Sequence, residues 1–178
     1  MSREKIYKKV VKAASKFCEW AENAPTDTET EARIGLQNMS LLYASLLGLA
    51  GLDLPDEEDI HSEKRIPIDQ WRNVYDRFES LPINSYVDVV TPLQNDGEVI
   101  RTDIQEELAD IYQDVAEGLE LYNTGYESDG LWHWRLTFEF HWGRRLLSVM
   151  NTLHAYFEDK ADWEVFSQDA PKSDALEG

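Results

Sequence analysis

Residues 131–147 read LWHWRLTFEFHWGRRLL, and the periodicity of this stretch decides the fold. Large apolar residues occupy every even position from Trp132 to Trp142, an alternation typical of a half-buried β-strand. A strand needs partners, however. The only other strand-like run, SYVDVV at 85–90, would complete a two-stranded ribbon, which is marginal in water.

On a helical wheel, the apolar residues of the same stretch cover more than half of the circumference. Such a wide apolar arc is typical of a central, largely buried helix. One face of the wheel holds Leu131, Phe138, Trp142, Leu146, Val149 and Leu153. We therefore predict one long helix that begins after Ser128 or Asp129 and ends near Lys160.

Four further segments have helical periodicity. Apolar residues recur at three- and four-residue spacing in about 6–22, 28–50 and 102–124, and a shorter pattern covers 70–81. Residues 82–101 lack this pattern and contain turn residues, so we expect them to be irregular.

Polar residues mark where these helices begin. Thr28 with Glu31, and Thr102 with Gln105, have the spacing of capping boxes. Asp69 precedes the short helical pattern and is expected to cap it. The sequence thus predicts an all-α bundle of four long helices plus one short helix, with the long Trp-rich C-terminal helix at its centre.

We predict one domain over residues 1–160 and a disordered polar tail over 161–178. Gly118 and Gly143 lie inside predicted helices, where each costs about 1 kcal/mol relative to alanine. A close approach of a neighbouring helix would explain both glycines.

The charge is unevenly distributed along the chain. Lys and Arg number 17 and Asp and Glu 35, which gives a net charge of −18. Residues 1–16 carry +5, and the remaining 162 residues carry −23. A protein surface with this much negative charge repels nucleic acid and favours basic partners. The basic first helix could lie against the acidic faces of its own chain or against a partner.

Composition favours a soluble, cytoplasmic protein. The charged start lacks the apolar core of a secretory signal, and the apolar run LLYASLLGLAGL at 41–52 is too short to span a bilayer. The single Cys18 excludes an internal disulfide and a cysteine-based zinc cluster. We expect neither a membrane nor a nucleic-acid partner.

Two segments carry a resemblance to a known family: DIYQDVAEGLELY at 110–122 and LWHWRLTFEFHWGRRLLSVMNTLHA at 131–155. Together they resemble a family of small bacterial proteins known only as a domain of unknown function. The resemblance covers most of residues 5–158 and implies a helical bundle. It implies no activity and no catalytic residue.

Candidate ligand-binding residues lie within the apolar arc of the last helix. Arg135 and Glu139 are four residues apart, so their side chains can meet, and Arg145 follows. One interpretation is a buried structural ion pair. The other is a pocket in which Arg135 binds an anionic ligand between Trp132 and Trp142.

Metal binding has a weaker basis. Acidic residues on one stripe of the 102–124 helix are Asp103, Glu107, Asp110, Asp114 and Glu117, the ligand type that Mg²⁺ prefers. No second set is evident opposite them, so a solvated acidic face is the alternative. His133 and His141 are eight residues apart, which does not favour a shared metal ion.

No phosphate-binding glycine loop, nucleophile elbow or HExxH motif occurs in the sequence. We therefore expect a non-catalytic cytoplasmic protein-interaction or regulatory module with a strongly acidic surface. The alternatives are a divalent-metal-dependent nucleotide phosphohydrolase and a sensor that binds a small anionic ligand near Arg135.

Overall fold

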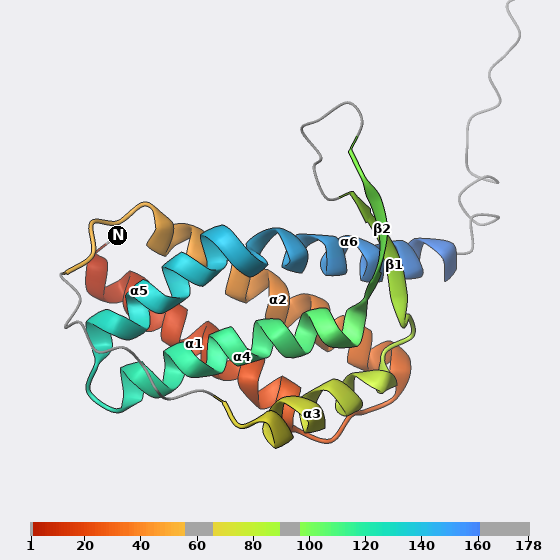
Figure 1. Cartoon of the computed structure of the whole chain (residues 1–178), viewed down its shortest axis with the longest axis horizontal. Helices are drawn as coiled ribbons and strands as arrows, with labels where there is room; N and C mark the ends of the chain where they lie inside the picture. Colours follow the sequence, from red (N-terminus) through yellow and green to blue (C-terminus); the bar gives the residue numbers. More distant parts are fainter. Residues whose placement is uncertain (1, 56–65, 90–96, 161–178) are drawn as a thin grey trace, which may run out of the picture.

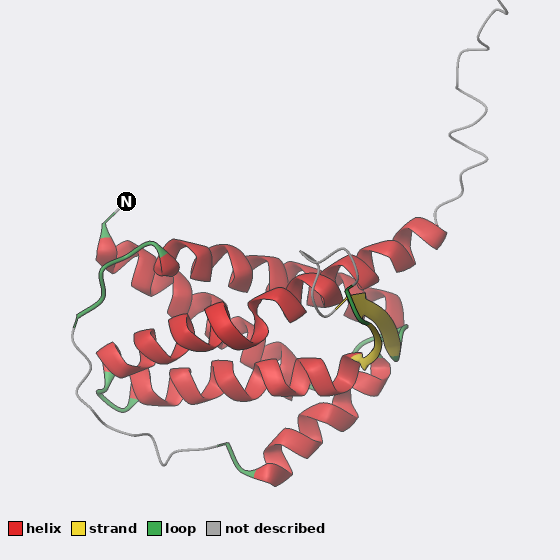
Figure 2. Cartoon of the chain, turned by 45° about the horizontal axis from the view of Figure 1, so that its top comes forward, coloured by secondary structure: helices red, strands yellow, loops and turns green. Residues whose placement is uncertain are grey.

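The chain forms an all-α helical bundle with a small β-ribbon at one end (Figure 1 and Figure 2). The computed structural model describes residues 2–55, 66–89 and 97–160, so the predicted tail at 161–178 lies outside the described residues. In chain order the elements are α1 (Arg3–Glu22), α2 (Thr28–Ala50), α3 (Ile68–Arg77), the 3₁₀ turn η1 (Phe78–Ser80), β1 (Ser85–Val89), β2 (Val99–Asp103), α4 (Ile104–Asn123), α5 (Glu127–Thr137), the π-helix η2 (Phe138–Trp142) and α6 (Gly143–Lys160).

The Trp-rich stretch is helical, as predicted, because α5, η2 and α6 follow one another without a break. Its even-numbered apolar residues are not equivalent. Trp134 and Trp142 are fully buried, whereas Leu136 is 56% exposed and Phe140 80% exposed. The apolar residues that alternate along the sequence therefore lie on two different faces of one helix, one in the core and one exposed to solvent.

The two glycines predicted to lie at close contacts do so in different ways. A Cβ atom on Gly118 would lie 2.3 Å from Nε1 of Trp134, so α4 and α5 touch there as predicted. A Cβ atom on Gly143 would lie 2.5 Å from the carbonyl oxygen of Phe138 in the same helical run. The expectation of a neighbouring helix is therefore wrong for Gly143, which makes room for the wider π-turn instead.

The long helices share one hydrophobic core. α1 packs on α2 and α4, α4 also packs on α5 and α3, and α2 packs on α6. Fully buried side chains come from every long helix and include Phe17, Met39, Leu46, Ile111, Tyr112, Trp134, Trp142 and Leu146. Each such side chain contributes about 1.5–3 kcal/mol through the hydrophobic effect.

Two long helices are capped by a residue next to the predicted cap. Asp27, not Thr28, caps α2 by accepting a hydrogen bond from the backbone N–H of Thr30. Asp103, not Thr102, caps α4, because its side chain accepts hydrogen bonds from the first backbone N–H groups of the helix.

Two further helix starts, and the role of Glu31 in α2, also differ from prediction. Pro67 precedes α3, and Asp69 lies in its first turn. Tyr126 precedes α5 without a side-chain cap, so Ser128 and Asp129 lie inside the helix. Glu31 does not complete a capping box but points into the core, where it pairs with Arg77.

Residues expected to be irregular contain a two-stranded antiparallel ribbon, in which β1 pairs with β2 from Ser85↔Asp103 to Val89↔Val99. The ribbon is stable because one of its faces packs on the bundle. Tyr86 is buried, and Asp88 accepts a hydrogen bond from Arg144 of α6 at 2.9 Å.

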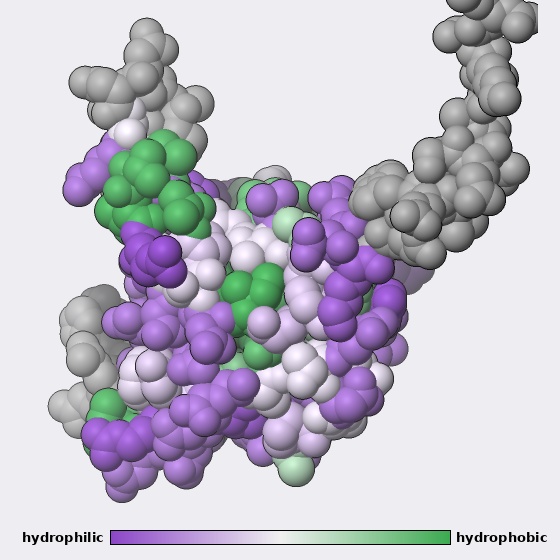
Figure 3. Space-filling model, turned by 90° about the vertical axis from the view of Figure 1, so that its right-hand side faces the viewer, coloured by the Kyte–Doolittle hydropathy of each residue, from purple (hydrophilic) through white to green (hydrophobic). Residues whose placement is uncertain are grey.

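The opposite face of the ribbon is exposed and apolar. Val87 is 64% and Val99 63% exposed, and Val89 lies beside them at 38%. Figure 3 shows this hydrophobic patch next to largely hydrophilic surface. Of the turn residues expected within 82–101, Asn95 and Asp96 lie outside the described residues.

Candidate functional site

The acidic residues predicted to form one stripe on α4 have three different environments. Asp103, at the start, accepts hydrogen bonds from the backbone N–H groups of Gln105 at 2.8 Å and Glu106 at 3.2 Å. Its carboxylate therefore serves to begin the helix.

Glu107 and Asp110 face α6. Nη1 of Arg145 lies 3.4 Å from a carboxylate oxygen of Glu107 and 3.8 Å from one of Asp110. Burial raises the pKa of Glu107, and the positive charge of Arg145 partly opposes this effect. Asp110 also accepts a hydrogen bond from the Trp71 indole at 3.0 Å. Arg145, predicted as a ligand-binding residue, is thus paired with carboxylates of its own chain.

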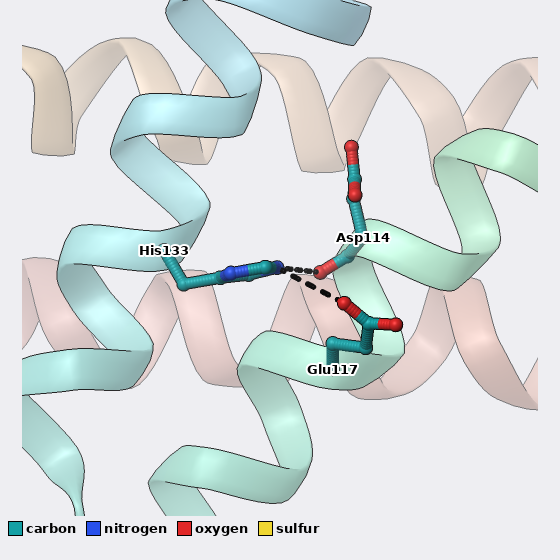
Figure 4. A group of neighbouring side chains, drawn as sticks. All are labelled: Asp114, Glu117 and His133. Carbon is teal, nitrogen blue, oxygen red and sulfur yellow. Dashed lines mark hydrogen bonds and ion pairs between the residues drawn. The ribbon is translucent and has the colours of Figure 1, made fainter. Parts of the chain in front are cut away.

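Further along α4, Asp114 and Glu117 meet His133 of α5 (Figure 4). His133 Nε2 lies 3.0 Å from the backbone carbonyl oxygen of Asp114 and 4.0 Å from Oε2 of Glu117. Each of the three side chains offers a potential metal ligand, and these atoms all lie within 4.8 Å of one another. One nitrogen and two carboxylates thus converge from two facing helices.

Neighbouring groups hold both carboxylates. His141 Nδ1 lies 2.6 Å from Oδ2 of Asp114. Burial raises the pKa of Asp114, while the contact with His141 works in the opposite direction. Oε1 of Glu117 accepts hydrogen bonds from the Gln113 side chain at 3.0 Å and from the backbone N–H of Ile66 at 3.2 Å.

This convergence was not predicted from the sequence, because the spacing of residues within one helix does not show which side chains face it from another helix. The necessary signal was present in two parts. The acidic stripe ends with Asp114 and Glu117, and His133 lies next to Trp134, which packs against Gly118. That contact fixes the register of α5 on α4 and brings His133 to the stripe.

The predicted pair of Arg135 and Glu139 forms at 3.3 Å, with side chains 25% and 33% exposed. Arg135 Nη1 also donates to the carbonyl oxygen of Leu52 at 2.9 Å. The guanidinium group lies 5.3 Å from the ring centroid of Trp132, whose indole donates to the carbonyl oxygen of Pro55. Arg135 and Trp132 therefore attach the segment after α2 to α5.

The other predicted wall of this pocket, Trp142, is fully buried in the core and donates its Nε1–H to Thr137 at 3.0 Å. Of the five predicted ligand-binding residues, the structure brings Arg135, Glu139 and Trp132 together. It places Trp142 in the core and Arg145 against α4.

A different surface lies between the first half of α1 and the second half of α2. It is a groove of about 350 Å³ lined by Ile6, Lys9, Lys12, Ala13, Lys16, Leu41, Ala44, Ser45 and Gly48. Aliphatic and small side chains form its apolar part, and Leu41 is 49% exposed there. We call this surface the lysine groove.

The lysines of this groove are exposed, because α1 buries its apolar face against the bundle. On α1, Lys8 pairs with Glu4 at 2.6 Å. Within the described part of the chain, no ion pair of Lys9, Lys12 or Lys16 is found. The lysine groove therefore presents positive charge beside apolar surface on an otherwise acidic protein.

Comparisons with known proteins give a family and a fold. Residues 2–158 match a family described as "Domain of unknown function (DUF5063)". No curated protein matches the chain. A crystal structure of the protein BF1032 from Bacteroides fragilis is similar, with a TM-score of 0.67, 23% sequence identity and coverage of 83% of this chain and 89% of that one. Among the described residues, we find no helix with the length and hydropathy needed to cross a lipid bilayer.

Proposed function

This chain belongs to the DUF5063 family of domains of unknown function, and we propose that it is a non-catalytic protein-interaction module. Its binding surface is the lysine groove, and its partner is a protein that presents an acidic, amphipathic helix. The observation that carries the proposal is the combination of an open apolar groove with three exposed lysines on a chain of net charge −18.

The shape of the groove supports a helical partner. α1 and α2 are consecutive, packed helices, and the lining residues on α1 run from Ile6 to Lys16. The ten helical steps from Ile6 to Lys16 extend over about 15 Å, enough for two to three turns of a bound helix. Apolar side chains at every third or fourth position of such a helix would contact Leu41 and Ala44, as in other helix-in-groove complexes.

Charge supports an acidic partner. Carboxylates on the outer edges of the bound helix would pair with Lys9, Lys12 and Lys16. Exposed ion pairs contribute only about 0.2–1 kcal/mol each, so the apolar contact supplies most of the affinity. The lysines instead provide orientation and selectivity. Nucleic acid is disfavoured, because the remainder of the protein repels phosphate groups at long range.

The alternative functions receive less support. The donors of Arg135 already engage Leu52 and Glu139, which leaves fewer of them for an anionic ligand. A magnesium-dependent phosphohydrolase would need several carboxylates at one point, but Asp103 and Glu107 are engaged in separate interactions. We propose the cytoplasm as the location of the protein, which cell fractionation would test.

Site-specific cross-linking would identify the partner. A photoreactive amino acid in place of Ala44, which is exposed in the groove, should cross-link one protein through an acidic helical segment. The same group in place of Asn73, exposed on α3, is the control. Equal labelling from both positions, or cross-links that do not map to an acidic helix, would contradict the proposal.

Binding of the identified segment as a peptide tests the contacts. We expect Ala44→Trp, which fills the groove without changing charge, and Lys12→Glu each to weaken binding by about tenfold, equivalent to 1.4 kcal/mol. Arg72→Glu makes the same charge change on the exposed surface of α3 and should have little effect. An equal loss with Arg72→Glu would show that general attraction, and not the groove, accounts for binding.

A further inference from the structure

We propose that Asp114, Glu117 and His133 bind a divalent transition-metal ion between α4 and α5. This site differs from the all-oxygen magnesium site predicted from the sequence, because it contains an imidazole nitrogen and excludes Asp103, Glu107 and Asp110. It is independent of the lysine groove, which lies between α1 and α2.

The ligand types indicate the class of metal ion. One histidine nitrogen and two carboxylate oxygens suit Zn²⁺, Mn²⁺ or Fe²⁺, whereas Mg²⁺ and Ca²⁺ prefer oxygen alone. Bonds from zinc to such ligands are about 2.0–2.2 Å long, so ligand atoms around one ion lie roughly 3–3.5 Å apart. Here the ligand atoms lie within 4.8 Å of one another, so small side-chain rotations suffice to close the site.

The surrounding contacts orient the carboxylates as in known metal sites. One oxygen of Asp114 is held by His141, and one oxygen of Glu117 is held by Gln113 and by the backbone of Ile66. Among the described residues, no hydrogen bond to the second oxygen of either carboxylate is found, and this oxygen is the one that we assign to coordination. Hydrogen-bonded neighbours of this kind fix the geometry of metal ligands and strengthen binding.

His133 must change its interaction when the ion binds. Its Nε2 atom now lies at hydrogen-bond distance from the backbone carbonyl oxygen of Asp114, to which only an N–H group can donate. On binding, the neutral ring changes tautomer: Nε2 gives up its proton to solvent, Nδ1 takes one from solvent, and the lone pair on Nε2 forms the bond to the ion. The ring needs only a small movement, because Oε2 of Glu117 is already 4.0 Å away (Figure 4).

Calorimetry with Zn²⁺ and Mn²⁺ on the full chain, after removal of bound metal with a chelator, tests the site. We expect one ion per chain, with affinity lowered at least tenfold by His133→Ala and by Glu117→Gln. His154→Ala removes an exposed histidine of α6 and should leave binding unchanged. Absence of binding, or an equal effect of His154→Ala, would overturn the proposal.

A second readout separates coordination from folding. Co²⁺ bound through one nitrogen and two carboxylates gives a visible absorption spectrum that should change in His133→Ala, while far-ultraviolet circular dichroism stays helical. If the variant binds Co²⁺ with an unchanged spectrum, the ion lies elsewhere and the proposed site is wrong. If the variant unfolds, Glu117→Gln, which preserves side-chain volume, decides the question by the same spectrum.

Discussion

Glu31 is buried where α1, α2 and α3 meet, with only 1% of its side chain exposed. It forms an ion pair with Arg77 and accepts hydrogen bonds from the Trp20 indole and from the backbone N–H of Thr26 at 2.9 Å. The Arg77 guanidinium group also lies over the Trp20 ring, 5.1 Å from its centroid. This buried ion pair joins α2 to α3, whereas the partly exposed pair of Arg135 and Glu139 lies within one helical run.

The environment of Glu31 makes stability depend on pH. Burial alone would raise its pKa, but the hydrogen bond from Thr26 and the charge of Arg77 outweigh burial and hold the pKa below its usual value of 4.5. A carboxylate with a lowered pKa in the folded state stabilises the protein above its unfolded-state pKa. That contribution is lost as the pH falls through the folded-state pKa.

We therefore expect Glu31→Gln to lower the free energy of unfolding by about 3–5 kcal/mol near neutral pH, because Arg77 is left as an unpaired buried charge. The difference from the unsubstituted protein should begin to shrink below about pH 4.5, where Glu31 of the unfolded chain becomes protonated, and should continue to shrink as the pH falls through the lower folded-state pKa. Denaturant titrations at several pH values would measure it. A difference that does not change with pH would contradict this assignment.

At the scale of elements, the wide apolar arc of the Trp-rich stretch sufficed to predict the long helix, and helical periodicity sufficed for the others. The π-helix at Phe138–Trp142 could not be predicted, because it depends on how α5 and α6 both pack on the bundle. The ribbon was missed because its stability comes from Tyr86 and Asp88 against the bundle, contacts that are invisible in the strand sequences themselves.

The candidate sites were predictable to different degrees. The acidic stripe on α4 and the basic character of α1 follow directly from the sequence. The meeting of His133 with Asp114, and the groove between Lys12 and Leu41, depend on the register of two packed helices. One sequence without a structure does not give this register.

The long helix allows a direct test of its two faces. Phe138→Ala should lower the free energy of unfolding by about 3–5 kcal/mol, because Phe138 is 6% exposed and packs against Tyr43 and Trp142. Phe140→Ser should change it by no more than about 0.5 kcal/mol, because Phe140 is 80% exposed. Similar losses in urea titrations of both variants would place both side chains in the core and refute the helical arrangement.

At the scale of the whole molecule, charge is separated. The lysines of α1 lie along one side, while the rest of the chain carries a large negative excess. Such an excess keeps a protein soluble but destabilises its compact state through self-repulsion. The described ion pairs of this protein, such as those of Arg144 with Asp88 and Arg145 with Glu107, offset only part of this repulsion.

Salt should therefore stabilise the protein. The screening length falls from about 30 Å at 10 mM salt to less than 10 Å at 300 mM, which removes repulsion between distant carboxylates but leaves contacts within the core unchanged. We expect the thermal midpoint in NaCl to rise by several degrees over this range.

The double variant Glu79→Lys and Glu98→Lys, at two exposed positions, changes the net charge from −18 to −14. It should be more stable than the unsubstituted protein at low salt, and the advantage should diminish as salt increases. A midpoint that is insensitive to salt, or an advantage of the variant that persists at high salt, would mean that local contacts, and not the summed charge, set the stability of this acidic bundle.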